Sequence, residues 1–369
     1  MKKILLIHSS VGLGHKVIVE NIAAELSKFP DVKISLLDIT KFYEGPLVQR
    51  STVLYKTLIG QFPRVYRFLY LNRLVQLLAL PLRLPLARNK SPKLREYLEQ
   101  DMPDLILTSQ TTATALISHL KQKGIYKGGF AVTFSDYHFH PFWVYPGADR
   151  FLVMIPEQIE EITKYGYARQ RIVVTGMPVD EAYEKKYEPA EILQKYNLSR
   201  KPVVLVMGGS MGFGIKESDI LALLESKFDI QVAVLTGGNR KLFEKLQELK
   251  SRCPGLAVLP ELPNTEVAKL FSVARVLVTK PGGLTLAQAL ASGLPMVLAN
   301  PLPAVEELNM EYIVNRGAAV SAKTSQELAG WVETLLSDKK FYQDQKERMR
   351  LLHVPGSASL AARTLIDML

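Results

Sequence analysis

The 369-residue sequence has a single cysteine, Cys253, and no uncharged apolar run near the ~18 residues of a membrane-spanning helix. One cysteine excludes an internal disulfide and any zinc cluster built from cysteines. The N-terminal apolar run, Ile4–Ile7, is too short for the core of a signal peptide, so we expect it to form the first strand. The chain also lacks short-period repeats and low-complexity segments. These absences fit a globular protein and are compatible with the cytosol.

Aspartate and glutamate are missing from residue 45 to residue 95. That stretch still carries ten lysines and arginines, so it accounts alone for the net charge of +10 that 46 Lys plus Arg and 36 Asp plus Glu give the chain. Large apolar side chains such as Phe62, Phe68 and Leu74 lie between the cations. Interfacial segments combine these two features, and each cation near an anionic surface adds about 1 kcal/mol. We predict an anionic membrane surface as a partner of this stretch.

Two other interpretations of the basic stretch stay open. A nucleic-acid patch has the same charge but is normally richer in lysine, glycine and polar residues and poorer in leucine, so we expect no nucleic-acid partner. A core-facing amphipathic helix with a solvated basic face is the second alternative. Pro81, Pro85 and the dispersed arginines argue against a segment that spans the membrane.

Short apolar runs alternate with helical patterns twice along the chain, which predicts strands separated by helices and hence parallel sheets covered on both faces. Two such halves predict an α/β protein with two doubly wound, Rossmann-like domains that face a cleft. We place the first domain at residues 1–180 and a charged, tyrosine-rich linker at 181–200. The twelve runs expected to be strands are residues 3–8, 32–37, 104–108, 129–134, 150–154, 171–175, 203–207, 231–235, 256–259, 276–279, 296–299 and 318–320.

The turn after the apolar run 274–278 reads Thr-Lys-Pro-Gly-Gly-Leu-Thr, from Thr279 to Thr285, and apolar residues then recur at helical spacing. A Pro-Gly-Gly turn at the start of a helix presents unpaired amides and the positive end of the helix dipole, which together bind phosphate. Gln288 lies one turn inside the helix on the face of Thr285, where it could reach a ribose hydroxyl. Taken alone, the glycines also fit an ordinary turn of a parallel sheet.

The motif Lys280-Pro-Gly-Gly-x-Thr285 resembles the nucleotide-sugar turn of the monogalactosyldiacylglycerol synthase and processive diacylglycerol glucosyltransferase family. This family is related to the lipid II-forming N-acetylglucosaminyltransferase and has the two-domain GT-B fold. It usually has Glu at the position of Gln288, and that glutamate binds the donor ribose. The resemblance implies a nucleotide-sugar-binding domain at 201–345 and a C-terminal helix at 346–369 that packs back on the N-terminal domain.

Further turns of the second half resemble the same family. A Gly-Gly-Ser turn follows the strand at 203–207, a Gly-Gly-Asn turn follows the strand at 231–235, and Leu262-Pro263-Asn264 lies where the uracil normally packs. The donor-binding residues that the resemblance implies are Gly208, Gly209, Ser210, Gly238, Asn239, Lys280, Pro281, Gly282, Gly283, Thr285, Gln288 and Glu306.

The segment Asn300–Glu307 departs from the family pattern. It aligns with a Pro-x-Pro-Gly-Gln-Glu motif that contacts the donor sugar, but Ala304 and Val305 replace the Gly and Gln and leave Glu306 in place. Sugar specificity depends on such polar contacts, so galactose, glucose and other sugars stay open.

The first strand is followed by Gly12-Leu13-Gly14-His15. A dinucleotide fingerprint fails here because its third glycine position is Val17. At a helix start the dipole favours the neutral, basic form of His15, which can take a proton from a hydroxyl. The resemblance implies that this Gly-x-Gly-His segment lines the acceptor side. A structural role, in which His15 only caps the turn, is the alternative.

The segment Phe134–Trp143 follows another predicted strand and resembles the family motif Thr-Asp-Tyr/Phe…His…Trp. Asp136 would lie at the carboxyl end of a parallel strand, where open α/β sheets bind ligands. It is either the general base or the residue that orients His15. Asp136, His138 and His140 could also be metal ligands, but no further ligand cluster is evident and we expect no metal. Trp143 either stacks on sugar or packs in the core.

The N-terminal half also carries Ser51-x-x-Leu-Tyr55 and Phe62-Pro-x-x-Tyr66, which resemble the segment by which these synthases contact the bilayer and admit their lipid. The residues that we assign to the acceptor and membrane side are Gly14, Tyr55, Tyr66, Arg67, His140 and Trp143, and the catalytic candidates are His15 and Asp136.

These observations and the resemblance predict an inverting hexosyltransferase that moves a hexose from a UDP-sugar to a membrane lipid, with diacylglycerol as the expected acceptor. No cofactor is expected, since the UDP-sugar is a substrate. We expect the enzyme in the cytoplasm, peripherally associated with the inner face of the cell membrane. Two alternatives are a soluble GT-B nucleotide-sugar 2-epimerase, which should not need the acid-free stretch, and a non-catalytic sugar-nucleotide- or lipid-binding relative, which Gln288, Ala304 and Val305 make credible.

Overall fold

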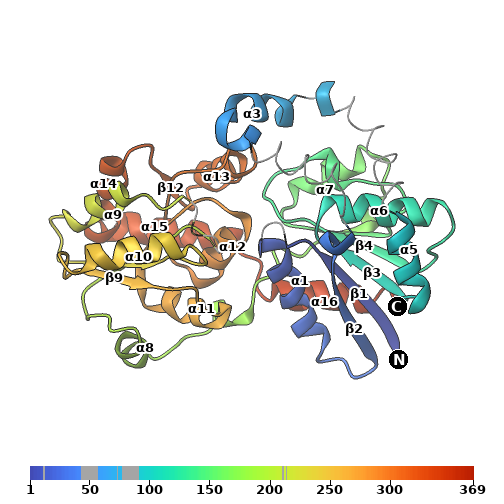
Figure 1. Ribbon diagram of the computed structural model, residues 1–369, viewed down its shortest axis with the longest axis horizontal. Helices are drawn as coiled ribbons and strands as arrows, with labels where there is room; N and C mark the ends of the chain where they lie inside the picture. The colour runs from blue at the N-terminus through green and yellow to red at the C-terminus, as the bar shows by residue number, and fades with distance from the viewer. Residues whose placement is uncertain (11–12, 43–56, 73, 77–90, 210–211, 213) are drawn as a thin grey trace. The chain divides into compact units, whose positions relative to one another are not determined.

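The computed structural model describes residues 1–10, 13–42, 57–72, 74–76, 91–209, 212 and 214–369. The chain forms two compact units (Figure 1): unit 1 comprises Met1–Pro178 and Gly356–Leu369, and unit 2 comprises Val179–Pro355. No helix in the described part of the chain is long and apolar enough to cross a membrane.

Unit 1 contains a six-stranded parallel sheet in the order β2-β1-β3-β4-β5-β6. Its central strands are buried along their length, which is why they read as nearly continuous apolar runs without alternation. Its strands are β1 (Lys2–His8), β2 (Val32–Asp38), β3 (Leu105–Thr108), β4 (Gly129–Thr133), β5 (Arg150–Val153) and β6 (Ile172–Val174). Its helices are α1 (Leu13–Leu26), α3 (Pro63–Leu71), α5 (Ser91–Gln100), α6 (Thr111–Gln122), α7 (Glu157–Thr163) and α16 (Ser357–Ile366), with 3-10 turns at Ile39–Phe42, Pro141–Trp143 and Arg169–Arg171.

Unit 2 contains a second six-stranded parallel sheet, in the order β12-β11-β10-β7-β8-β9. Its strands are β7 (Val203–Met207), β8 (Gln231–Leu235), β9 (Leu256–Leu259), β10 (Ala274–Thr279), β11 (Met296–Leu298) and β12 (Val320–Ser321). Its helices are α8 (Pro189–Lys195), α9 (Glu217–Leu224), α10 (Arg240–Lys250), α11 (Asn264–Val273), α12 (Gly283–Ser292), α13 (Val305–Asn315), α14 (Ser325–Ser337) and α15 (Lys339–Leu352), with a 3-10 turn at Glu181–Glu184.

All twelve predicted runs form strands, with ends that differ from the prediction by no more than two residues. The strand orders locate one switch point in each sheet, the place where successive crossovers leave in opposite directions. In unit 1 it lies between β1 and β3, and in unit 2 between β7 and β10. Open α/β sheets bind ligands outside the carboxyl ends of the strands at such points. We therefore expect binding sites at the loops after β1, β3, β7 and β10.

The C-terminal part of the chain is divided between the units. We expected residues 346–369 to leave the second domain together, but α15 stays in unit 2 and only α16 packs against α1 in unit 1 (Figure 1). The break falls at Pro355 and Gly356, because proline cannot continue a helix and Gly356 takes a left-handed conformation with φ 63°.

Residues 181–200, predicted as a linker, belong to unit 2. Tyr183 is buried and packs edge-on against Phe271 of α11, with ring centroids 5.2 Å apart. Ile192 of α8 is buried as well, so these short helices are part of the domain core. The prediction of a linker was wrong because the apolar residues in this segment stand singly among charged residues and form no apolar run.

Candidate functional site

The loop after β1 meets the loop after β3 at the switch point of unit 1. The Ser109 hydroxyl, which follows β3, lies 3.2 Å from the carbonyl oxygen of His15 and 3.3 Å from that of Ile7, so it can donate to either. His15 is the third residue of α1, at the positive end of that helix. No described atom would come within 4 Å of a Cβ at Gly14, so this glycine leaves open space in front of the helix.

His15 is held in its neutral form. Burial of the ring lowers the pKa of His15 below its usual 6.5, and the nearby charge of Asp136 acts in the opposite direction without reversing the shift. The ring nitrogen Nδ1 is enclosed and has no hydrogen-bond partner among the described residues. A neutral imidazole beside a carboxylate can accept a proton and have the resulting cation stabilised.

Asp136 follows β4, and its charge acts on the His15 imidazole by raising its pKa against the effect of burial. Its Oδ2 accepts a hydrogen bond of 2.9 Å from the Ser135 hydroxyl. Its backbone is held by Gln158, a buried residue of α7 whose Nε2 donates to the carbonyl oxygens of Asp136 at 2.9 Å and of His138 at 3.0 Å. The Oε1 of Gln158 accepts from the amide of Met154 at 2.8 Å, so this side chain links the loop that carries Asp136 to the end of β5.

An aromatic cluster follows Asp136. Trp143 is buried, stacks on Phe134 with centroids 5.2 Å apart, and lies 6.4 Å from the His15 ring. Of the two roles left open for Trp143, the structure shows core packing. His140 is also buried and stacks on Tyr70 of α3, with centroids 4.3 Å apart. The cluster therefore joins the loop that carries Asp136 to the helix α3.

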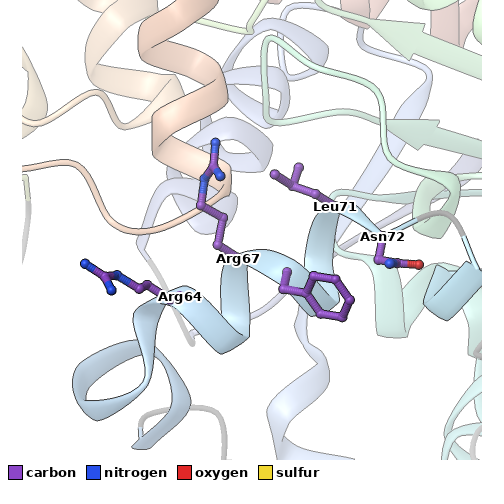
Figure 2. A pocket seen from close by; sticks show the side chains of 5 residues that line it. Arg64, Arg67, Leu71 and Asn72 are labelled. Carbon is purple, nitrogen blue, oxygen red and sulfur yellow. The ribbon is translucent and has the colours of Figure 1, made fainter.

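Helix α3 has no buried residue. Its side chains and those that flank it include five exposed large apolar residues, Phe62, Val65, Phe68, Leu69 and Leu74. A pocket of about 310 Å³ is lined by Arg64, Arg67, Phe68, Leu71 and Asn72, and Figure 2 shows the two arginines projecting from α3 one turn apart. Tyr66 lies 6.0 Å from Tyr70, ring to ring. Cations and apolar groups thus share one surface, as an amphiphilic ligand requires.

The switch point of unit 2 brings Lys280 and Glu306 together. Lys280, which follows β10, forms an ion pair with Glu306 Oε1, and the side chains are only 17% and 8% exposed. Glu306 Oε2 accepts a hydrogen bond of 2.8 Å from the amide of Leu302. This pair places a fixed cation beside the start of α12.

The glycine-rich loop after β7 folds closely over Lys280. A Cβ on Gly209 would lie 3.4 Å from Lys280 Cε, and one on Gly214 would lie 3.4 Å from Lys280 Cδ. Both glycines have positive φ, 71° and 89°, so the backbone conformation favours glycine at both positions, and the contact with the lysine is an ordinary van der Waals one. A Cβ on Gly212 would lie 2.2 Å from the carbonyl oxygen of Thr236, so this loop also packs against the turn after β8.

The helix starts around this loop differ in how they are capped. Gly282 precedes α12 and offers no side-chain cap, so the first amides of α12, up to Thr285, have no side-chain acceptor from the cap position. Asn239 caps α10 by accepting from the amide of Leu242 at 3.1 Å, while Gly238 beside it is exposed. Uncapped amides beside a lysine form an anion-binding arrangement.

Gln288 occupies a deeper position than expected. It is 5% exposed, and its Nε2 donates a hydrogen bond of 3.0 Å to Asn264 Oδ1, which also accepts from the Tyr183 hydroxyl at 2.9 Å. The amide is therefore already engaged inside the domain.

Two predicted site residues, Ser210 and Tyr55, lie outside the described residues. Pro281 accepts a hydrogen bond of 3.4 Å from Asn309, and Gly283 is the first residue of α12. No group of three His, Cys, Asp or Glu residues in the described ranges is placed to hold a metal ion. His138 and His140, the two histidines considered as ligands, are both engaged with Tyr70.

Sequence reasoning missed Tyr70, Gln158 and Ser109 as members of the site. Tyr70 follows Tyr66 by four residues, a spacing that places both rings on one helix face, so a helical reading of this stretch could have found it. Gln158 and Ser109 had no local signal, because their partners lie 22 and 94 residues away in the sequence.

Comparison with known proteins gives the family. Residues 14–179 match the family described as "Monogalactosyldiacylglycerol (MGDG) synthase", and residues 191–351 match "Glycosyl transferases group 1". The processive diacylglycerol beta-glucosyltransferase of Bacillus cereus is 30% identical over 72% of this chain and 68% of its own length. That of Bacillus licheniformis is 26% identical over 99% of this chain and 95% of its own. The chain belongs to the family of monogalactosyldiacylglycerol synthases and processive diacylglycerol glucosyltransferases. It is therefore a hexosyltransferase.

Solved structures confirm the fold. MurG from Acinetobacter baumannii is 16% identical, with a TM-score of 0.61 and complete coverage of both chains. The MnaA–UDP structure from S. aureus is 14% identical, with a TM-score of 0.65 over 100% of this chain and 96% of its own. Both share the GT-B fold with this protein. A UDP-N-acetylglucosamine 2-epimerase matches as well, with a TM-score of 0.63, so the fold alone does not separate transferase from epimerase and the sequence family does.

Proposed function

We propose that this protein transfers a hexose from a UDP-sugar to diacylglycerol at a membrane surface, with inversion at the anomeric carbon. The observation that carries the proposal is the similarity to processive diacylglycerol glucosyltransferases along 99% of the chain. The geometry of each unit supplies groups suited to one half of the reaction.

Unit 1 offers the groups for the acceptor. Neutral His15 or Asp136 takes the proton of the lipid hydroxyl as its oxygen attacks the anomeric carbon and the bond from that carbon to the diphosphate breaks. If His15 is the base, Asp136 stabilises the imidazolium that forms; if Asp136 is the base, His15 orients the hydroxyl. A single displacement of this kind inverts the configuration at the anomeric carbon.

Unit 2 offers the groups for the donor. Lys280 and the uncapped amides of α12 are suited to the charge that develops on the departing nucleotide. These fixed positive groups support a reaction that needs no metal ion and no cofactor. Glu306, at the start of α13, holds Lys280 in this position, since its two carboxylate oxygens are engaged by the lysine and by the Leu302 amide.

The surface of α3 supports peripheral binding to the inner face of the cell membrane. Phe62 and Phe68 are 53% and 60% exposed, and Arg64 and Arg67 lie beside them. Sedimentation with anionic vesicles tests this part: Phe68→Ser should reduce binding severalfold, whereas Leu351→Ser, which removes an equally exposed apolar residue (60%) from α15, should not. Equal binding by both variants would remove α3 from the contact surface.

The activity itself is tested by incubating the protein with several UDP-hexoses and diacylglycerol and searching for new glycolipids by mass spectrometry. His15→Ala and Asp136→Asn should each lower turnover at least a hundredfold while UDP affinity, a property of unit 2, changes little. Full activity in both variants would refute the catalytic assignment. Conversion of a UDP-sugar to its epimer without any glycolipid would refute the transferase proposal.

A further inference from the structure

Helix α3 is attached to unit 1 without burying a side chain of its own. Its exposed residues include Val65, Phe68 and Leu69, which are 47%, 60% and 39% exposed. A helix that presents its apolar residues to the outside gains little from the hydrophobic effect, so specific contacts must fix its position. Tyr70, in its last turn, makes several such contacts.

Tyr70 makes the contacts that join α3 to the loop carrying Asp136. Its hydroxyl lies 2.9 Å from His138 Nε2, and its ring stacks on His140. The backbone carbonyl of Tyr70 lies 3.3 Å from His140 Nε2 and accepts a hydrogen bond of 2.6 Å from Gln76. One residue of α3 therefore contacts two histidines of the loop through its hydroxyl, its ring and its backbone.

The hydrogen bonds fix the tautomer of His140. Its Nδ1 accepts from the amide of Phe142 at 3.2 Å, so in the neutral ring the proton is on Nε2. Nε2 then donates to the Tyr70 carbonyl. Gln76 Nε2, which donates to the same Tyr70 carbonyl oxygen at 2.6 Å, lies 3.4 Å from this ring nitrogen.

The same loop is fixed from the opposite side by Gln158. This buried side chain donates to the carbonyl oxygens of both Asp136 and His138. His138 is therefore held by its side chain from α3 and by its backbone from α7, and Asp136 is only two residues away. A shift of Tyr70 would therefore act on His138 and Asp136, the two residues whose carbonyl oxygens accept hydrogen bonds from Gln158.

We propose that Tyr70 is a positioning residue that couples α3 to the catalytic loop. Contact of α3 with the lipid surface then sets the position of Asp136 relative to His15 through His138 and His140. This inference rests on the proposed function for its catalytic consequence, whereas the coupling itself is a property of unit 1. The contacts of Tyr70 described above are with His138, His140 and Gln76, so it acts on Asp136 through the loop.

The test compares three variants of the full chain. Tyr70→Phe removes only the hydroxyl contact with His138, and Tyr70→Leu removes the ring contacts as well. Tyr165→Phe is the matched control, because Tyr165 packs on Phe139 of the same loop with centroids 5.7 Å apart but its hydroxyl makes no hydrogen bond among the described residues. Each variant is examined by ring ¹⁵N NMR, by amide hydrogen exchange and by transfer kinetics.

Tyr70→Phe should shift the His138 ring signals and leave His140 as the Nε2–H tautomer. Tyr70→Leu should also perturb His140 and accelerate exchange of the amides of residues 135–140 about tenfold. Turnover by Tyr70→Phe should fall about fivefold, the equivalent of one ordinary hydrogen bond, with KM for the UDP-sugar unchanged. Tyr165→Phe should match the wild type in all three measurements.

Unchanged exchange in Tyr70→Leu would overturn the coupling, whatever the enzyme does. Normal turnover in Tyr70→Phe, with the His138 signals shifted, would overturn the catalytic consequence. Failure of the proposed function is recognised separately, since the wild type would then make no glycolipid while the NMR and exchange results still decide whether Tyr70 fixes the loop.

Discussion

Replacing Gln158 with leucine gives the sharpest test of how the catalytic loop is held. The side chain is 1% exposed and makes three hydrogen bonds of 3.0 Å or less, from the amide of Met154 at 2.8 Å and to the carbonyl oxygens of Asp136 at 2.9 Å and His138 at 3.0 Å. The amide of Ile155 donates a fourth, longer hydrogen bond of 3.4 Å to the same side chain. Leucine has a similar volume but can neither donate nor accept, so all four backbone groups lose this partner.

The expected loss of stability follows from these contacts. Each of the three shorter hydrogen bonds contributes about 1 kcal/mol, which gives a loss of about 3 kcal/mol. Burial of the apolar leucine offsets about 1 kcal/mol of this loss. A net loss of about 2 kcal/mol should lower the Tm of unit 1 by about 4–8 °C, since domains of this size lose about 2–4 °C per kcal/mol. Turnover of the folded variant should fall as well, because Asp136 is no longer held in place.

Gln158→Glu distinguishes the role of the side-chain oxygen, which accepts, from that of the side-chain nitrogen, which donates. A carboxylate still accepts from the Met154 amide but cannot donate to the two loop carbonyls, so it should reduce turnover about as much as leucine does. Gln345→Leu is the matched control in unit 2: Gln345 is 2% exposed, its Oε1 accepts from the Met296 amide at 3.0 Å, and its Nε2 has no partner among the described residues.

The assays are thermal unfolding and transfer kinetics under conditions where every variant is folded. Gln345→Leu loses one hydrogen bond of about 1 kcal/mol and gains about the same from burial of the leucine, so it should change stability by less than about 1 kcal/mol and leave turnover unchanged. If Gln158→Leu keeps wild-type turnover while losing stability, the clamp on the Asp136 loop has no catalytic role. If it keeps both, the hydrogen bonds of Gln158 contribute nothing to stability or to turnover.

Three further predictions concern single residues of the site. Ala304 has φ 62° and ψ −76° in a γ-turn closed by the hydrogen bond from the Val305 amide to the Pro303 carbonyl. Ala304→Val should therefore lower the free energy of unfolding, measured in urea, by about 3 kcal/mol, whereas Ala304→Gly should change it by less than about 1 kcal/mol. Lys280→Met leaves Glu306 buried without its cation and should cost about 3 kcal/mol, most of which Glu306→Gln in the same background should restore, as a double-mutant cycle will show. Burial lowers the pKa of His15, so the folded state binds fewer protons than the unfolded state just below pH 6.5; stability should fall as the pH drops through that region, and the acidic limb of kcat/KM should lie below pH 6.5 if His15 is the base.

Local patterns predicted the strands because each buried strand is a separate apolar run. The run at 203–207, for example, is fully buried, and its ends coincide with the prediction. The same reasoning failed at residues 181–200, where Tyr183 and Ile192 are buried as single residues in short elements that pack against α11. A single apolar residue among charges carries no periodic signal, so only its tertiary partner shows that it belongs to a core.

The turns of the site were predicted as motifs, and the structure supplies their mutual contacts. The Gly208-Gly209 turn and the Lys280 turn were identified separately, but the fit of Gly209 and Gly214 around the lysine depends on β7 and β10 being neighbours. Gln288 was expected to face a ligand, and its position 5% exposed against Asn264 could not be read from helical spacing, which gives a face and no depth.

The sequence by itself determined the twelve strands, the doubly wound architecture and the family, because these depend on apolar periodicity and on short motifs that are contiguous in the chain. The tertiary structure alone decided that Tyr70 contacts His138 and His140, that Gln158 clamps the backbone of Asp136, and that burial keeps His15 neutral. These properties depend on groups brought together from distant parts of the sequence, and both the hydrogen bond and the desolvation of a charge act only over a few ångströms.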